Sequence, residues 1–282
     1  MNQPQPRPSV PPAPGLSPLD RTIRRRLGRV GWGMLLYLVT TQVLGGVLAL
    51  IPGVQENIYL LMGINEVVSY GIGPLVLWLL IRPLPQGTGP ELKLSPRAFV
   101  RTALFCLGVL YLFNLLTTLL MLAIETLSGS STGNLLETVA NQVPMGLYLV
   151  MVGLIAPVME ELIFRKLLLD RLRPFGDRAA ILISGVAFGL FHMNLYQFFY
   201  ATALGLVLGG IALKTGKLWH TMALHAIVNL SSPAFNALIS SGTPGATVGN
   251  LLVWVLIGLA VYCLIRYAKT FRYAPPAPPV TN

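Results

Sequence analysis

Charged residues are scarce in this chain of 282 residues, and their scarcity excludes a water-soluble globule. They make up 11% of the sequence, whereas a soluble domain carries about 25%. Cysteine is nearly absent: Cys106 and Cys263 both lie in apolar stretches, which excludes a disulfide scaffold and a thiolate metal site. Hydrophobic residues reach 54% and the mean hydropathy is +0.68, so a disordered chain is excluded as well. The composition predicts a polytopic membrane protein.

Basic residues outnumber acidic ones by 20 to 10, but their placement indicates membrane topology and not a nucleic-acid surface. Every Lys and Arg falls into one of five clusters, separated by apolar stretches of about 20 residues, the length that a bilayer core requires. Membrane lipid is therefore the expected partner of these charges, through weak attraction to anionic headgroups. The clusters are Arg7 with Arg21–Arg29, Arg82–Arg101, Arg165–Arg178, Lys214 with Lys217, and Arg266–Arg272.

The apolar stretches predict an all-α membrane bundle of about eight transmembrane helices with both termini in the cytoplasm. Alternate connections (52–56, 125–142, the turn near Asn194 and 240–247) contain no Lys or Arg, so every basic cluster falls on the opposite side. Basic residues gather on the cytoplasmic side of short loops. The expected spans are Val30–Ile51, Asn57–Ile81, Ala98–Ile124, Val143–Leu169, Ala179–Met193, Tyr196–Leu213, Leu218–Ile239 and Val248–Ile265.

Proline-rich segments at the two ends, residues 1–20 and 274–282, are expected to be disordered tails. The first apolar run is too long for the core of a signal peptide, so it is expected to remain as the first span. Inside the bundle, Gly205 and Gly209 have the small-xxx-small spacing of closely packed helices. The Ser184–Gly185 pair is interpreted as small-residue packing too.

Ionisable side chains at membrane depth mark candidate functional sites, because a charge there costs about 2.5–3.5 kcal/mol. Only three acidic residues lie inside the predicted spans: Glu66, Glu160 and Glu161. The three histidines, His192, His220 and His225, also lie in spans or at their edges. His220 is near a cytoplasmic end, where a boundary role is expected.

Three pairs of polar or aromatic residues have i,i+4 spacing, which places both members on one helix face. Glu161 and Arg165 can form an ion pair, which explains Glu161 structurally but leaves the deeper Glu160 without a local cation. In the same way Phe188 can cover one side of His192, and His225 shares a face with Asn229. Each pair alone is more often structural, but together they offer a carboxylate, two imidazoles and an amide on three helices.

This set of groups suits hydrolysis. A carboxylate in an apolar pocket can take a proton from water, and a histidine can orient that water or bind a metal that activates it. Asn and a second His can donate hydrogen bonds to the oxyanion of a tetrahedral intermediate. A serine nucleophile with a base partner is not evident, and the H-E-x-x-H zinc signature is absent.

At these residues the chain resembles the CAAX prenyl endopeptidase and bacteriocin-processing family, which comprises intramembrane proteases of the Abi type. EELIFR (Glu160–Arg165), FGLFH (Phe188–His192) and HAIVN (His225–Asn229) match, in order, the E-E-x-x-x-R, F-x-x-x-H and H-x-x-x-N motifs of that family. The resemblance covers about a third of the chain. It implies a protease-like core in 143–240, preceded by three helices in 21–142 and followed by a last helix in 241–273.

The resemblance also implies roles for these residues. Glu160 would activate water with the help of His192, while His225 and Asn229 would stabilise the oxyanion; Glu161, Arg165 and Phe188 would support them. Alternatively Glu160, His192 and His225 would bind a divalent metal such as zinc. The expected substrate is a peptide or protein, with or without a lipid, processed in peptide maturation or immunity at a prokaryotic plasma membrane. The competing interpretation is a catalytically inactive binding protein or a small proton-coupled transporter, which would use Glu66.

Overall fold

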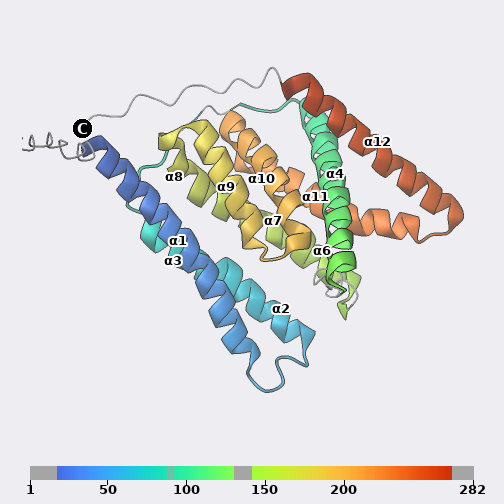
Figure 1. Ribbon diagram of the computed structural model, residues 1–282, viewed down its shortest axis with the longest axis horizontal. Coiled ribbons are helices and arrows are strands. Elements are labelled where there is room, and N and C mark those ends of the chain that lie inside the picture. The colour runs from blue at the N-terminus through green and yellow to red at the C-terminus, as the bar shows by residue number, and fades with distance from the viewer. Residues whose placement is uncertain (1–17, 88, 90–91, 130–141, 269–282) are drawn as a thin grey trace, which may run out of the picture.

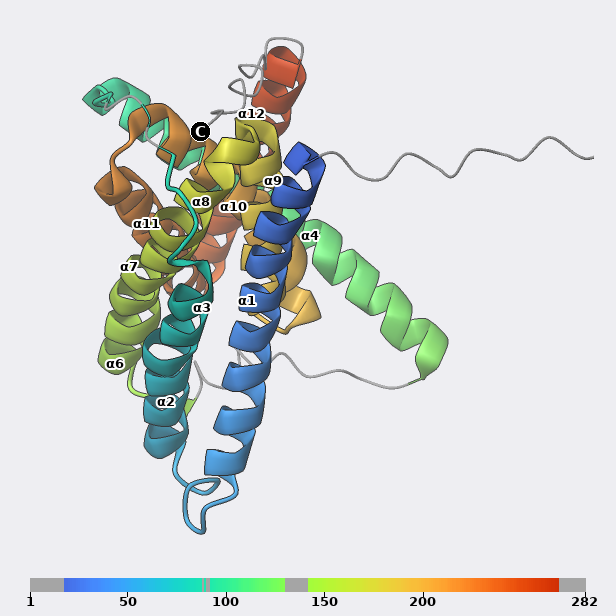
Figure 2. The same ribbon diagram turned by 90° about the vertical axis from the view of Figure 1, so that its left-hand side faces the viewer.

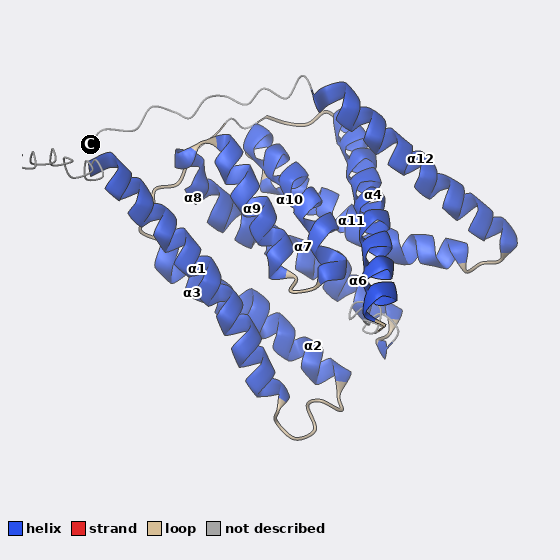
Figure 3. Ribbon diagram, in the orientation of Figure 1, coloured by secondary structure: helices blue, strands red, loops and turns tan. Residues whose placement is uncertain are grey.

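The computed structural model describes residues 18–87, 89, 92–129 and 142–268, and these residues form helices without a single strand (Figure 3). The predicted tails therefore lie mostly outside the described residues. The elements are α1 Pro18–Ala49, α2 Ile58–Glu66, η1 Val67–Ile72, α3 Gly73–Ile81, α4 Pro96–Ser128, α6 Met145–Val150, η2 Met151–Ile155, α7 Ala156–Glu161, η3 Leu162–Leu169, α8 Asp170–Leu172, η4 Arg173–Phe175, α9 Asp177–Phe191, α10 Leu195–Thr215, α11 Leu218–Ile239 and α12 Thr243–Ala268.

Seven of the described helices are long and apolar enough to cross a membrane. Two of them are composite: α2, η1 and α3 form one continuous helix, and α6 to η4 form another over Met145–Phe175. The remaining expected span, Ala179–Met193, corresponds to α9, which has 15 residues and a length of about 22 Å at 1.5 Å per residue. It is therefore shorter than the bilayer core of about 30 Å, although it lies where the sequence predicts a helix.

The helices form two groups around the centre of the bundle. α1 packs antiparallel along α3 and η1, while α4 packs on α10, α11 and α12 (Figures 1 and 2). α9 and α10 form a tight hairpin between them. At its crossing point a Cβ on Gly205 would lie 2.9 Å from the Gly185 Cα, so glycine is needed there, whereas the same atom on Gly209 would lie 3.8 Å from Ile181. The predicted close packing is thus confirmed at Gly205, and Gly209 makes only an ordinary contact.

A π-helical turn interrupts the helix that carries the acidic pair. In η2 the Ala156 N–H donates to the carbonyl of Met151, five residues back. The same pattern would direct the next carbonyl, that of Val152, to residue 157, which is a proline without an N–H. The Val152 carbonyl is therefore available to a side chain from another helix. Single π-helical turns of this kind are frequent at functional sites.

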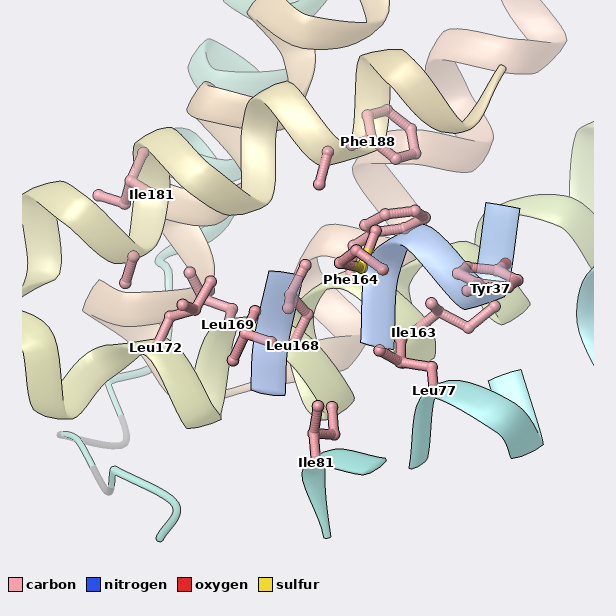
Figure 4. Close-up of a cluster of buried hydrophobic side chains, with 14 of the residues drawn as sticks. Tyr37, Leu77, Ile81, Ile163, Phe164, Leu168, Leu169, Leu172, Ile181 and Phe188 are labelled. Carbon is pink, nitrogen blue, oxygen red and sulfur yellow. The ribbon is translucent and has the colours of Figure 1, made fainter. Parts of the chain in front are cut away.

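The main apolar core lies at the end of the bundle where α8 begins. Figure 4 shows the side chains of Leu168, Leu169 and Leu172 packed against Ile181 of α9, with Ile81 of α3 below them. Each of the three leucines is at most 1% exposed. This core fixes the helix of the acidic pair between α1, α3 and α9.

Candidate active site

One cavity of about 1240 Å³ brings together residues from six helical spans and the short helix α9. Glu160, His192, His225 and Asn229 all line it, together with Phe188. The four side chains for which the sequence predicts a joint role thus share one space, even though they come from α7, the end of α9 and α11.

The two oxygens of Glu160 have different neighbours. Oε1 accepts a hydrogen bond of 2.6 Å from the hydroxyl of Tyr70 in η1. Oε2 lies 3.7 Å from Nε2 of His225, which is too long for a direct hydrogen bond. The side chain is 5% exposed. One oxygen is therefore held by a fixed donor, and the other faces an imidazole across a short gap.

Glu161 lies at the centre of a buried network of charges. Its Oε2 is 3.1 Å from Nε of Arg165, which confirms the expected i,i+4 ion pair, and its Oε1 is 3.1 Å from Nδ1 of His225. The Arg165 guanidinium also donates to the hydroxyl of Ser184 over 3.2 Å, and that hydroxyl donates to the Phe164 carbonyl. Arg165 and Glu161 are at most 1% exposed, so the network has no contact with bulk water.

These contacts select one tautomer for each histidine of the cavity. The Glu161 carboxylate, paired with Arg165, acts as the acceptor, so His225 carries its proton on Nδ1. In His192, Nδ1 lies 2.9 Å from the Phe188 carbonyl, which can only accept. Nδ1 is thus a donor in both rings. In the neutral state Nε2 of each ring is a bare acceptor, and a hydrogen on Nε2 of His225 requires the imidazolium.

Phe188 separates the two imidazoles. Its ring meets His192 edge to face at 5.0 Å between centroids and His225 at 5.5 Å. The guanidinium carbon of Arg165 lies 5.2 Å from the centre of the same ring, within the range of a cation–π contact. The predicted covering of His192 by Phe188 is confirmed, and Phe188 fixes His225 and Arg165 as well.

Asn229 is oriented by the π-helical turn of the neighbouring helix. Its side-chain amide donates to the Val152 carbonyl over 2.8 Å. The amide nitrogen carries a second hydrogen, and Asn229 lines the cavity one helical turn after His225. The orientation of this side chain thus depends on the carbonyl that η2 and Pro157 leave available.

Two residues of the site were missed by sequence reasoning. Tyr70 lies in NEVVSY, close to Glu66, to which the hydrolysis interpretation gives no role. Polar side chains at membrane depth were the signal in the sequence that could have identified Tyr70. Ser184 was interpreted as packing, but its hydroxyl holds Arg165. His220, which was expected near a helix end, lies in the first turn of α11. Its side chain is buried, and its ring is tilted by 41° relative to that of Trp219 at 4.0 Å between centroids.

Glu160, His192 and His225 offer suitable atoms for a metal ion, but their spacing does not suit one. Over the described residues, no group of three His, Cys, Asp or Glu side chains lies close enough together to hold a metal. A zinc site needs at least three protein ligands at about 2.0–2.3 Å. The alternative with a metal is therefore not supported by the geometry, and the chemistry below uses no metal.

The part of the chain that carries this site also matches known proteins. Residues 142–231 match the sequence pattern of the type II CAAX prenyl endopeptidase Rce1-like family. The segment is thus similar to the Rce1-like family over about a third of the chain. It contains Glu160, His192, His225 and Asn229, whereas Tyr70 lies outside it.

Part of the chain is also similar to a curated protein. The chain is 30% identical over 84 residues to a protein of Bacillus subtilis (strain 168) named "Putative membrane peptidase YdiL". The match covers 29% of this chain and 34% of YdiL, so it spans about a third of the length of that relative. No solved structure matches the chain. Over these 84 residues the chain is thus similar to a protein that bears the name of a putative membrane peptidase.

Proposed function

We propose that the protein is an intramembrane endopeptidase that hydrolyses a peptide bond in the cavity between Glu160 and His225. The observation that carries this proposal is the 3.7 Å gap between Glu160 Oε2 and His225 Nε2. A water molecule that lies beside this pair in the cavity can hydrogen-bond to both groups. The match of residues 142–231 to the Rce1-like family pattern supports the proposal.

Glu160 acts as the general base. Because Tyr70 holds Oε1, Oε2 is the oxygen that accepts a proton from the water. The Nε2 atom of His192 carries no hydrogen and accepts the other hydrogen of this water. The lone pair of the water oxygen is thereby directed at the substrate carbonyl. General-base catalysis of this type contributes about 10²–10⁴ to the rate.

His225 and Asn229 stabilise the oxyanion. His225 acts as the imidazolium, held by Glu161 on Nδ1, so its Nε2–H donates to the developing negative charge. The second amide hydrogen of Asn229 is the other donor. When the tetrahedral intermediate collapses, the C–N bond breaks and Glu160 passes its proton to the leaving amine. Both carboxylates and both histidines thereby return to their starting states.

The central test is Glu160→Gln, which keeps the shape and the acceptor for Tyr70 but removes the base. We expect cleavage of a fluorogenic peptide by the purified protein to fall by about 10²–10⁴, while the protein still inserts and elutes as before. Glu56→Gln is the matched control, since Glu56 is exposed in the connection between α1 and α2. Unchanged cleavage by Glu160→Gln would overturn the mechanism.

The substrate class is tested by the same assay. One peptide that ends in C-a-a-X is offered with and without a prenyl group on its cysteine. Preference for the prenylated form would support the prenyl-protein class, and equal rates would support general peptide processing. Neither result affects the assignment of Glu160.

The competing function is proton-coupled transport, and one observation favours it. Glu66 lines the same cavity, and its Oε2 is buried without a hydrogen-bond partner. A transporter would lose substrate uptake in Glu66→Gln and would show no peptide hydrolysis. A peptidase would retain hydrolysis in that variant and lose it in Glu160→Gln.

A further inference from the structure

The residues that line the cavity lie away from one end of each helix. On α1 they are Thr41 and Gln42, in the second half of the helix. On α4 they begin at Leu110, near the middle of the helix, and end at Glu125. On α10 they lie at the beginning and end at Leu204.

The helices of the acidic pair and of His225 follow the same rule. From Met145 onward the lining residues are spaced by one turn and end at Glu160; no described residue from Leu162 to Phe175 lines the cavity. On α11 the lining begins at His225, two turns after the start of the helix. Glu160 and His225 are thus at the inner end of the cavity, whereas His192 follows the end of α9, nearer to the turn at Asn194.

The helix ends without lining residues are the ends that carry the basic clusters. Arg21–Arg29 lie in the first turns of α1, and Arg97 and Arg101 lie in the first turns of α4. Lys214 is in the last turn of α10, and Lys217 directly precedes α11. Figure 1 shows the start of α1, α8, the start of α4 and the end of α12 at one end of the bundle. No Lys or Arg is among the described residues that line the cavity.

The basic end of the bundle is closed by packing. Beyond Glu160 the helix buries Phe164, Leu168 and Leu172, each completely, against α1, α3 and α9 (Figure 4). At the other end the cavity has polar and exposed walls, among them Gln42, Asn65 and Asn114 from three different helices. The packed core therefore blocks access to Glu160 from the basic end, and the exposed polar walls lie toward the end that lacks basic residues.

We propose that the site receives its substrates from the non-cytoplasmic side of the membrane, so that these substrates are peptide segments exposed outside the cytoplasm. Basic residues remain on the cytoplasmic side, and the cavity opens at the opposite end. Ionisable side chains at membrane depth face water-filled space, which agrees with Glu66 and Glu125 on its walls. The statement about substrates rests on the proposed peptidase function, whereas the side of access does not.

The test measures access directly. In a background with Cys106→Ala and Cys263→Ser, single cysteines are placed in the cavity (Asn65→Cys), in the α1–α2 connection (Glu56→Cys) and at the basic end (Arg97→Cys). A membrane-impermeant sulfonated maleimide is added to intact spheroplasts or to inverted vesicles of a bacterial host. We expect Asn65→Cys and Glu56→Cys to react in spheroplasts only, and Arg97→Cys to react in inverted vesicles only.

Each other outcome overturns the proposal in a recognisable way. Reaction of Glu56→Cys in inverted vesicles would show the opposite orientation. Reaction of Glu56→Cys but not of Asn65→Cys in spheroplasts would show a closed cavity, provided that Asn65→Cys reacts after denaturation. The labelling requires no turnover, so it still decides the side of access if Glu160→Gln proves as active as the parent and the peptidase proposal fails.

Discussion

The Tyr70 hydroxyl donates a 2.6 Å hydrogen bond to Glu160 although 90 positions separate the two residues in the chain. It joins the N-terminal helices to the Rce1-like segment at the carboxylate on which the proposed chemistry depends. A hydrogen bond to a charged group contributes about 1.5–3 kcal/mol, and each 1.36 kcal/mol corresponds to a factor of ten in rate.

Tyr70→Phe should therefore lower kcat by about 10- to 100-fold with a smaller change in KM, because the substrate contacts remain while Glu160 loses its orientation. Steady-state kinetics on the purified variant provide the measurement. Tyr59→Phe is the control, since Tyr59 is 53% exposed on α2 and should behave as the parent. An unchanged kcat in Tyr70→Phe would show that the hydrogen bond has no role in turnover.

Breaking the buried ion pair should destabilise the fold as well as the site. Arg165→Met leaves Glu161 charged and buried, and removing one partner of such a pair costs about 3–5 kcal/mol. We expect a clear fall in the thermal unfolding temperature in detergent. The double variant Glu161→Leu with Arg165→Met should recover much of that loss but no activity, because His225 then lacks its anchor. Full activity in the double variant would contradict the assigned role of Glu161.

The hairpin of α9 and α10 offers a matched pair of glycines. Gly205→Ala places a methyl group 2.9 Å from the Gly185 backbone, so we expect a loss of about 1–3 kcal/mol in the free energy of unfolding. Gly209→Ala has room at 3.8 Å and should be tolerated. Unfolding in denaturant compares the two. Equal stability would mean that the hairpin adjusts without cost.

Asn229 should contribute to turnover as one of two oxyanion donors. Asn229→Ala is expected to lower kcat by about 10²–10³ and to leave a measurable residual rate, because His225 remains. His225→Ala should cost at least as much. If Asn229→Ala changed only KM, the amide would bind the substrate instead of stabilising the transition state.

Metal content provides an independent check on the site. The described residues contain no three-ligand group, so elemental analysis of the active protein should show zinc well below one ion per chain. Treatment with a chelator should leave the cleavage rate unchanged. Stoichiometric zinc that disappears together with activity, in the parent and in His225→Ala, would reverse this interpretation.

Local patterns in the sequence predicted those features that depend on a single helix. The helix over Leu218–Ile239 was predicted with the bounds that the structure has. The pairing of Glu161 with Arg165 and the covering of His192 by Phe188 follow from i,i+4 spacing, and both are confirmed. Span counting was less successful for α9, since length alone does not show whether 15 residues cross the bilayer.

Contacts between distant helices could not be predicted in this way. Tyr70 approaches Glu160 only because α1 and α3 pack on the helix of the acidic pair, and one sequence contains no information on that packing. Ser184 holds Arg165 for the same reason. The sequence places His220 near a helix end but does not show that other residues cover its side chain completely. Burial of a side chain depends on its neighbours in space, which periodicity does not specify.

The π-helical turn at Met151–Ile155 makes the site depend on the number of residues in the chain as well as on their kinds. With one of residues 153–155 removed, the Ala156 N–H would lie four residues after Met151, as in a regular α-helix, while Pro157 would still leave the Val152 carbonyl available to Asn229. Glu160, however, would rotate by about 100° relative to the residues before the turn. A deletion that removes no polar side chain could therefore inactivate the protein, and alignments of relatives that place a gap in this turn would identify chains with a different site.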